Sequence, residues 1–84
     1  MMTEAEAMTL VAALKSGKRF ATRFQEEEWG IIYEDNGRFQ KWSHRVEPFE
    51  GGKEEWSREQ MSEAEVVALL MAYYSFDRMQ AGLR

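Results

Sequence analysis

Apolar residues near the start of the chain recur with the period of an α-helix. They fall at i, i+3, i+4 and i+7 and are Ala7, Leu10, Val11 and Leu14. This spacing places them on one side of a helix. Thr3 and Glu6 have the spacing of a capping box, in which each side chain bonds the backbone amide of the other residue. Gly17 is a typical residue just beyond a helix end, so the pattern predicts a helix over residues 4–16.

A second apolar pattern predicts a helix over residues 63–79, with Ser62 and Glu65 as its capping box. Its apolar positions spread over more than half of the helix circumference, whereas a surface helix usually buries a narrower stripe. We therefore expect part of this surface to pack on the first helix or to contact another chain. The candidate contact residues form one flank of the helix and are Val67, Met71 and Tyr74.

The segment between the two predicted helices has the composition of β-strands. Its β-branched and aromatic residues concentrate in residues 19–25, 29–34 and 38–46. Asn36-Gly37 joins the last two runs and is a strong hairpin signal, because a type I′ turn needs positive φ at both central positions. Residues 54–60 are polar except for Trp56 and are a candidate for a short fourth strand.

These elements predict an α+β fold. An N-terminal helix precedes a three- or four-stranded antiparallel meander and a C-terminal helix, and both helices are expected to pack on one face of the sheet. The 84 residues predict a single domain, 1–84. Its core is expected to be modest, because a chain of this length buries roughly 60–65% of its unfolded surface.

The two-residue turn also predicts which side chains share a face of the sheet. Counted outward from the turn, Ile31 faces Trp42, and the alternation of side chains along a strand places such pairs on one face. A four-residue loop at 25–28 adds the aromatic residues of the first strand to that face. The predicted buried face carries Phe20, Phe24, Trp29, Ile31, Tyr33 and Trp42.

The opposite face of the sheet is predicted to be open and rich in bases. Its candidate binding residues are Arg19, Arg23, Ile32, Phe39, Lys41 and Arg45. One face of an antiparallel sheet can remain in solvent, and Arg and Lys are ordinary residues there. Single-stranded nucleic acids also bind sheets that combine bases with aromatic residues, so this face supports two interpretations.

The sequence contains little that is typical of an active site. It has no cysteine and one histidine, His44, which the predicted register places on the buried face. A Cys–His pair is therefore excluded, and no nucleophile-elbow motif surrounds a serine. His44 with Glu47 and Glu50 matches no standard metal-binding pattern. We predict no enzyme activity, no cofactor, no metal site and no small-molecule substrate.

The net charge of −4 and the absence of cysteine are compatible with a cytoplasmic protein. No apolar run approaches the roughly 20 residues that a membrane span needs, so no membrane partner is expected. The sequence favours a small non-catalytic domain that acts through protein–protein contact, as a regulator or inhibitor, or as a homodimer through the C-terminal helix. The alternative is single-stranded nucleic-acid binding on the basic face of the sheet.

Overall fold

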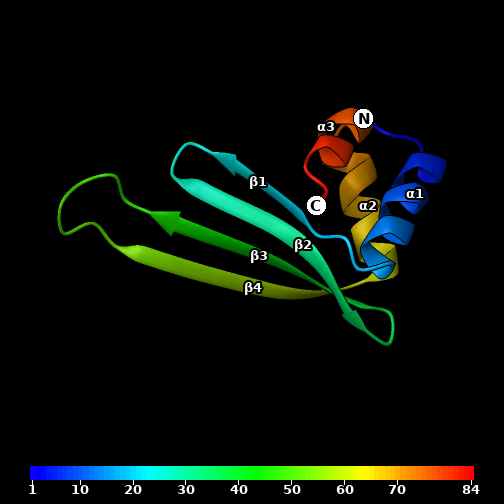
Figure 1. The fold of residues 1–84 in the computed structure, drawn as a ribbon, viewed down its shortest axis with the longest axis horizontal. Coiled ribbons are helices and arrows are strands. Elements are labelled where there is room, and N and C mark those ends of the chain that lie inside the picture. The colour runs from blue at the N-terminus through cyan, green and yellow to red at the C-terminus, as the bar shows by residue number, and fades with distance from the viewer.

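A computed structural model describes all 84 residues of the chain. The elements in chain order are α1 (Glu4–Lys15), β1 (Phe20–Phe24), β2 (Glu27–Asp35), β3 (Arg38–Val46), β4 (Glu54–Ser62), α2 (Glu63–Tyr73) and α3 (Phe76–Ala81) (Figure 1). The four strands form an antiparallel meander in the order β1-β2-β3-β4, and the helices pack on it. The predicted α+β fold, with its helices on one sheet face, is confirmed.

Local capping chemistry begins the first two helices where the sequence predicts. Thr3 and Ser62 each accept a hydrogen bond from the backbone amide three residues later and form complete capping boxes with Glu6 and Glu65. The predicted C-terminal helix is too long, however, because the chain leaves helical geometry at Tyr74, with φ −125° and ψ 152°. Ser75 then caps a separate short helix by accepting a hydrogen bond from the Arg78 amide.

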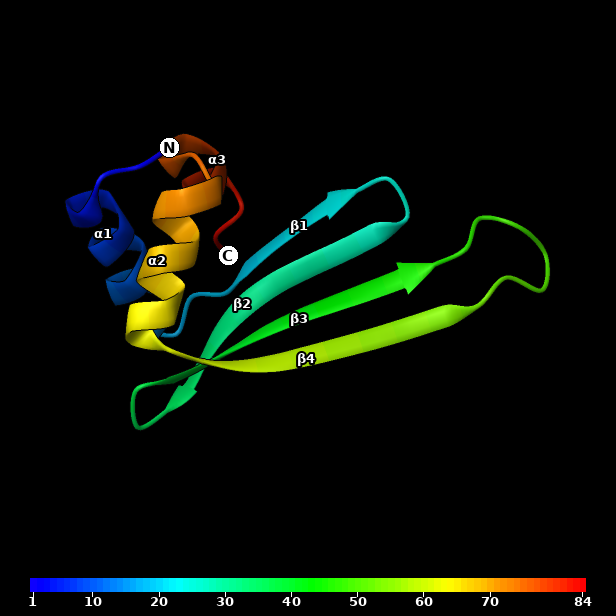
Figure 2. The same cartoon turned by 180° about the vertical axis from the view of Figure 1, so that it is seen from behind.

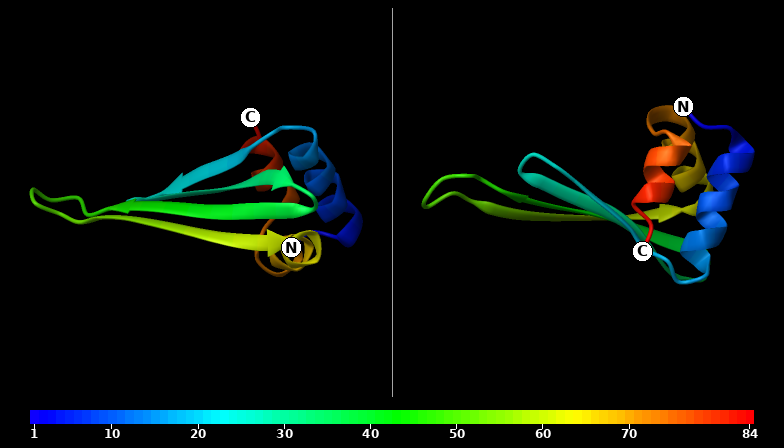
Figure 3. Two further views of the ribbon diagram at one scale, coloured as in Figure 1. Left: turned by 90° about the horizontal axis from the view of Figure 1, so that it is seen from below. Right: turned by 45° about the horizontal axis from the view of Figure 1, so that its top comes forward.

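The helices gather at one end of the sheet, and we call this the covered end (Figures 1 and 2). The other end carries the β1–β2 turn and the β3–β4 loop, and we call it the free end. The molecule is consequently elongated, with extents of 44, 26 and 21 Å. Figure 3 shows the helices on one side of the sheet at the covered end, while the strands continue past them. Strand backbone at the free end therefore has no helix over either face.

The core lies between the helices and the covered end of the sheet. It contains twelve buried apolar side chains. The sheet contributes Phe20, Ile31, Phe39 and Met61, and the helices contribute Ala7, Leu10, Val11, Leu14, Val66, Leu70 and Met79. Met2 completes the cluster. The apolar stripe predicted for the first helix is thus confirmed as core.

The predicted register between β2 and β3 is wrong beyond the turn. Asn36 and Gly37 do adopt positive φ, 50° and 75°, and Asp35 faces Arg38 as predicted. The register then shifts between Asp35 and Tyr33, which leaves one extra residue in β2. Such a bulge exchanges the two faces of every residue of β3 that follows. It has a clear energetic cause, because the shifted register buries Phe39 in the core.

The register between β1 and β2 has the predicted parity, although its loop is shorter. Phe24 faces Glu27, and Phe20 faces Ile31. Gln25 adopts a positive φ of 56° in the tight turn. Because the loop is shorter by an even number of residues, the aromatic residues of β1 and β2 still share the helix-side face, as predicted.

Candidate functional site

The six predicted sheet-face residues do not form one surface. The bulge moves Phe39, Lys41 and Arg45 to the helix-side face, where Phe39 is 0% exposed in the core. Arg23 and Ile32 remain on the open face. Arg19 precedes β1, and its backbone exchanges two hydrogen bonds with Arg84. The prediction of a basic open face is therefore wrong, because two of its bases belong to the opposite side.

The open face instead presents aromatic rings from β3 and β4. His44 faces Trp56, and their rings stack with centroids 4.0 Å apart and planes inclined by 16°. The His44 Nε2 atom lies 2.6 Å from Oε1 of Glu54. The guanidinium of Arg58 lies 5.8 Å from the centre of the Trp56 ring, a distance at which a cation is attracted to an aromatic face.

Trp42 lies flat on the open face because its neighbour on β2 is glycine. A Cβ atom built on Gly30 would lie 2.8 Å from Cε2 and Cζ2 of the Trp42 ring and 2.2 Å from the carbonyl oxygen of Phe20. Glycine in a strand commonly marks such a close approach. A shallow hollow of about 270 Å³ lies beside this ring, lined by Glu28, Gln40, Trp42, His44, Trp56 and Arg58.

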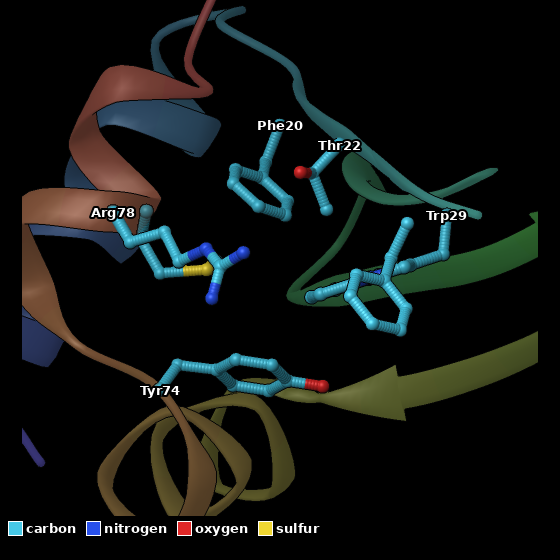
Figure 4. A pocket seen from close by; sticks show the side chains of 7 residues that line it. Phe20, Thr22, Trp29, Tyr74 and Arg78 are labelled. Atoms are coloured by element: carbon cyan, nitrogen blue, oxygen red, sulfur yellow. The ribbon is translucent and has the colours of Figure 1, made fainter. Parts of the chain in front are cut away.

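A second hollow lies on the helix-side face, where the sheet leaves the helices (Figure 4). We call it the elbow cleft. It has a volume of about 260 Å³ and is lined by Phe20, Thr22, Phe24, Trp29, Tyr74, Arg78 and Met79. In Figure 4 the side chains of the two strands face Tyr74 and Arg78 across a common space. Five of the seven lining residues are hydrophobic, so the cleft is predominantly apolar.

The elbow cleft depends on the break between α2 and α3. The ring of Trp29 lies between Phe20 and Tyr74, with both centroid distances equal to 5.0 Å. Tyr74 reaches this position because it leaves α2 in extended conformation. The short α3 then places Arg78 at the rim and Met79 in the core. A continuous helix through these residues would direct their side chains differently, since each residue would add a fixed rotation about one axis.

Two cations without an ion pair stand near the elbow cleft. The only ion pairs of the chain join Lys15 to Glu63, Arg38 to Asp35 and His44 to Glu54. Arg78 lines the cleft, and the ammonium of Lys41 lies 5.5 Å from the centre of the Trp29 ring. Glu27 lies near Lys41, whereas no carboxylate lines the cleft itself beside Arg78.

The phenol of Tyr74 stays protonated at physiological pH. Partial burial raises its pKa above the ordinary value, because burial disfavours the charged form. The negative charge of Glu27 acts in the same direction. The hydroxyl group can thus donate a hydrogen bond to a ligand in the cleft, beside the apolar rings.

The predicted helix flank is divided between two places. Val67 and Met71 are partly buried and line a shallow hollow with Met8 of α1. Tyr74 lies instead in the elbow cleft. The nearby side chains of Lys15 and Glu63 form an ion pair, and this contact raises the pKa of Lys15. The three residues therefore do not share one surface.

Sequence reasoning missed the elbow cleft because it assigned Phe24 and Trp29 to a closed core. Phe24 is 64% exposed, since no helix reaches that far along the sheet. Arg78 was not a candidate at all. Ser75 provides the signal that would have found it, because serine followed by Phe76-Asp77 is typical of a new helix start.

Metal coordination, membrane spanning and similarity to known proteins give little further information about this site. No group of three or more His, Cys, Asp or Glu side chains is arranged to hold a metal ion. None of the helices combines the length and apolar character that crossing a membrane requires. No family model matches the chain, and neither curated proteins nor solved structures give a match. The two hollows combine apolar rings with nearby cations.

Proposed function

We propose that this protein is a small non-catalytic binding domain whose partner is another protein. The observation that carries this proposal is the elbow cleft, an open hollow walled by aromatic rings in which Phe24 is largely exposed. The centres of protein interfaces are enriched in aromatic residues, methionine and arginine, and all three kinds line this cleft. A domain of this type acts by occupying its partner, as a regulator or inhibitor, and we place it in the cytoplasm.

The size of the cleft favours a side chain over a small molecule. Pockets for small molecules usually measure roughly 300–1,000 Å³, and the elbow cleft has about 260 Å³. An aromatic side chain that enters it would bury roughly 150–250 Å², worth about 4–6 kcal/mol before the costs of association. One anchor of this kind is the usual centre of a binding hot spot.

A photo-crosslinking experiment with a matched control tests the proposal. Benzoylphenylalanine replaces Phe24 at the cleft in one variant and Phe49 in the β3–β4 loop in the other. The two positions are almost equally exposed, at 64% and 63%. We expect a discrete crosslinked protein, identified by mass spectrometry in the source cells, from position 24 only. The same products from both positions, or none from position 24, would contradict the proposal.

Single-stranded nucleic-acid binding is the second candidate, supported by the aromatic rings of the open face. Trp42 and the stacked pair of His44 and Trp56 offer surfaces on which bases can stack. The balance of charge favours this candidate less, since Glu28 lies opposite Arg23 and lines the same hollow as Arg58. Nucleic-acid binding predicts that a fluorescent poly-dT oligonucleotide binds the protein at low salt and binds the Trp56→Ala variant more weakly. No binding at low salt eliminates it.

A further inference from the structure

Strand β4 is an open edge of the sheet. It pairs with β3 along nine residues without a register shift, and nothing pairs with its other side. Seven consecutive residues, from Glu54 to Gln60, are exposed. The opposite edge differs, because Arg84 bonds to Arg19, just before β1, and Gly82 bonds to Ala21 within it. An open edge of this length, with no proline and no bulge, is a template for another strand.

The hydrogen bonds of β3 show which backbone groups of β4 point outward. The Glu47 amide donates to the carbonyl oxygen of Lys53 at 3.0 Å, so odd-numbered residues of β4 turn their backbone groups toward β3. The close stacking of Trp56 on His44 agrees, because side chains approach most closely at pairs without mutual hydrogen bonds. The amides and carbonyls of Glu54, Trp56 and Arg58 therefore face solvent.

Charge decides which register a symmetric antiparallel pair of β4 strands can adopt. With Trp56 opposite its own copy, Glu54 of one chain faces Arg58 of the other. Lys53 likewise faces Glu59, which adds a second pair of opposite charges. The pattern EEWSRE at residues 54–59 is thus complementary to itself around Trp56.

The neighbouring registers all create like-charge contacts. Centring the pair on Glu55, Arg58 or Glu59 places that residue against its own copy. Centring it on Ser57 places Glu55 against Glu59 twice. Like charges directly opposite each other on paired strands are destabilising, so among the registers centred on residues 55–59 only the Trp56 register avoids repulsion.

The single chain leaves three of the four charged residues of this register without ion-pair partners. Lys53, Arg58 and Glu59 take part in no ion pair, and Glu54 contacts His44 through one carboxylate oxygen only. Trp56 at the centre is 58% exposed. Edge-to-edge pairing would give each of these groups a partner and would cover the central ring.

We infer that two copies of this chain associate through β4, with Trp56 of each copy opposite Trp56 of the other. The two-fold axis is perpendicular to the sheet, so two four-stranded sheets join into one and both sets of helices lie on the same side. The elbow clefts border the far edges, beside β1, and stay open. Self-association is therefore independent of the proposed partner of the cleft.

Cysteine crosslinking tests the register directly, because the native chain contains no cysteine. Opposed residues of a hydrogen-bonded pair have Cα atoms about 5.5 Å apart, within disulfide range. Under mild oxidation we expect Trp56→Cys alone to form a disulfide-linked dimer. Glu55→Cys and Ser57→Cys should crosslink when mixed and not separately. The inference is overturned if Phe49→Cys, the loop control, crosslinks as fast as Trp56→Cys, or if Glu55→Cys or Ser57→Cys crosslinks alone.

Charge exchange tests the same interface without cysteine. By sedimentation, Glu54→Arg and Arg58→Glu should each raise the dimer dissociation constant about tenfold, because each places two like-charge pairs in the interface. The double exchange should return it to within about threefold of the native value, since the pairs become opposite again. Met71→Glu should have no effect. A monomer at all concentrations, or a dimer lost in Met71→Glu and kept in both charge variants, would overturn the inference.

Discussion

The two ends of the sheet carry similar apolar side chains, which are buried at one end and exposed at the other. At the covered end Phe39 and Ile31 lie under the helices and are fully buried. At the free end Phe24 lies on β1 and Trp56 lies on β4, the strands next to those of Ile31 and Phe39. Both side chains are largely exposed. The strands are continuous from one end to the other, so the difference arises from the reach of the helices. Aromatic content by itself therefore does not distinguish core from exposed surface in this protein.

The limited reach of the helices also explains why the bulge in β2 affects burial at one end of the sheet only. At the covered end a one-residue shift decides whether Phe39 enters the core, and the energetic difference is large. At the free end the same shift only exchanges partly exposed side chains between two uncovered faces. The covered end therefore determines the register, and the free end follows it.

Truncation of a core ring should have the largest effect. Phe39→Ala should lower the free energy of unfolding by about 3–5 kcal/mol, the usual cost of removing a buried aromatic ring. Phe49→Ala at the free end should change it by less than about 0.5 kcal/mol. Urea denaturation of both variants measures the contrast. Equal losses would mean that the two ends do not differ in packing.

A methyl group added between the two faces should cost less. Gly30→Ala places a Cβ atom against the Phe20 carbonyl and the Trp42 ring, and overpacking of this kind costs about 1–3 kcal/mol. Adding Trp42→Ala should restore only part of the loss, because the backbone contact remains. A double-mutant cycle of unfolding free energies in urea measures this coupling. If Trp42→Ala removed the whole cost of Gly30→Ala, the steric clash would be with the ring alone.

Substitutions of free-end aromatics should barely affect stability. Phe24→Ser and Trp56→Ala each remove a side chain that is mostly in solvent, so we expect changes in unfolding free energy within about 1 kcal/mol. We expect Trp56→Ala to fall in the upper part of that range, because it also removes the stacking on His44. A loss comparable with that of Phe39→Ala, measured in the same urea series, would show that the free end belongs to the core.

The smallest expected effect concerns pH and the start of α2. The backbone and side-chain hydrogen bonds of Ser62 lower the pKa of Glu65 below its ordinary value. A carboxyl group with a lowered folded pKa stabilises the protein above its unfolded pKa, and this contribution disappears as the pH falls through the folded value. Glu65→Gln should therefore flatten the acid side of the stability profile. A profile measured by urea titration that matches the native one would contradict this assignment.

The elements of the fold could be predicted because their signals are local. Thr3 with Glu6 and Ser62 with Glu65 begin their helices through contacts within one turn. Residues 54–60, a candidate for a fourth strand from their sequence, lie in β4 together with Trp56. The elbow cleft could not be predicted in the same way. It needs the break at Tyr74 and the limited reach of the helices, and both depend on packing between distant segments.

The sequence by itself determined the Asn36-Gly37 turn and the two capping boxes, because each depends on interactions among a few adjacent residues. Only the tertiary structure decided which face each residue of β3 occupies. A bulge costs little locally, and burial of Phe39 against Ile31 and Met61 repays that cost only when the helices are in place. The same packing ends α2 at Tyr74 and leaves β4 as a free edge.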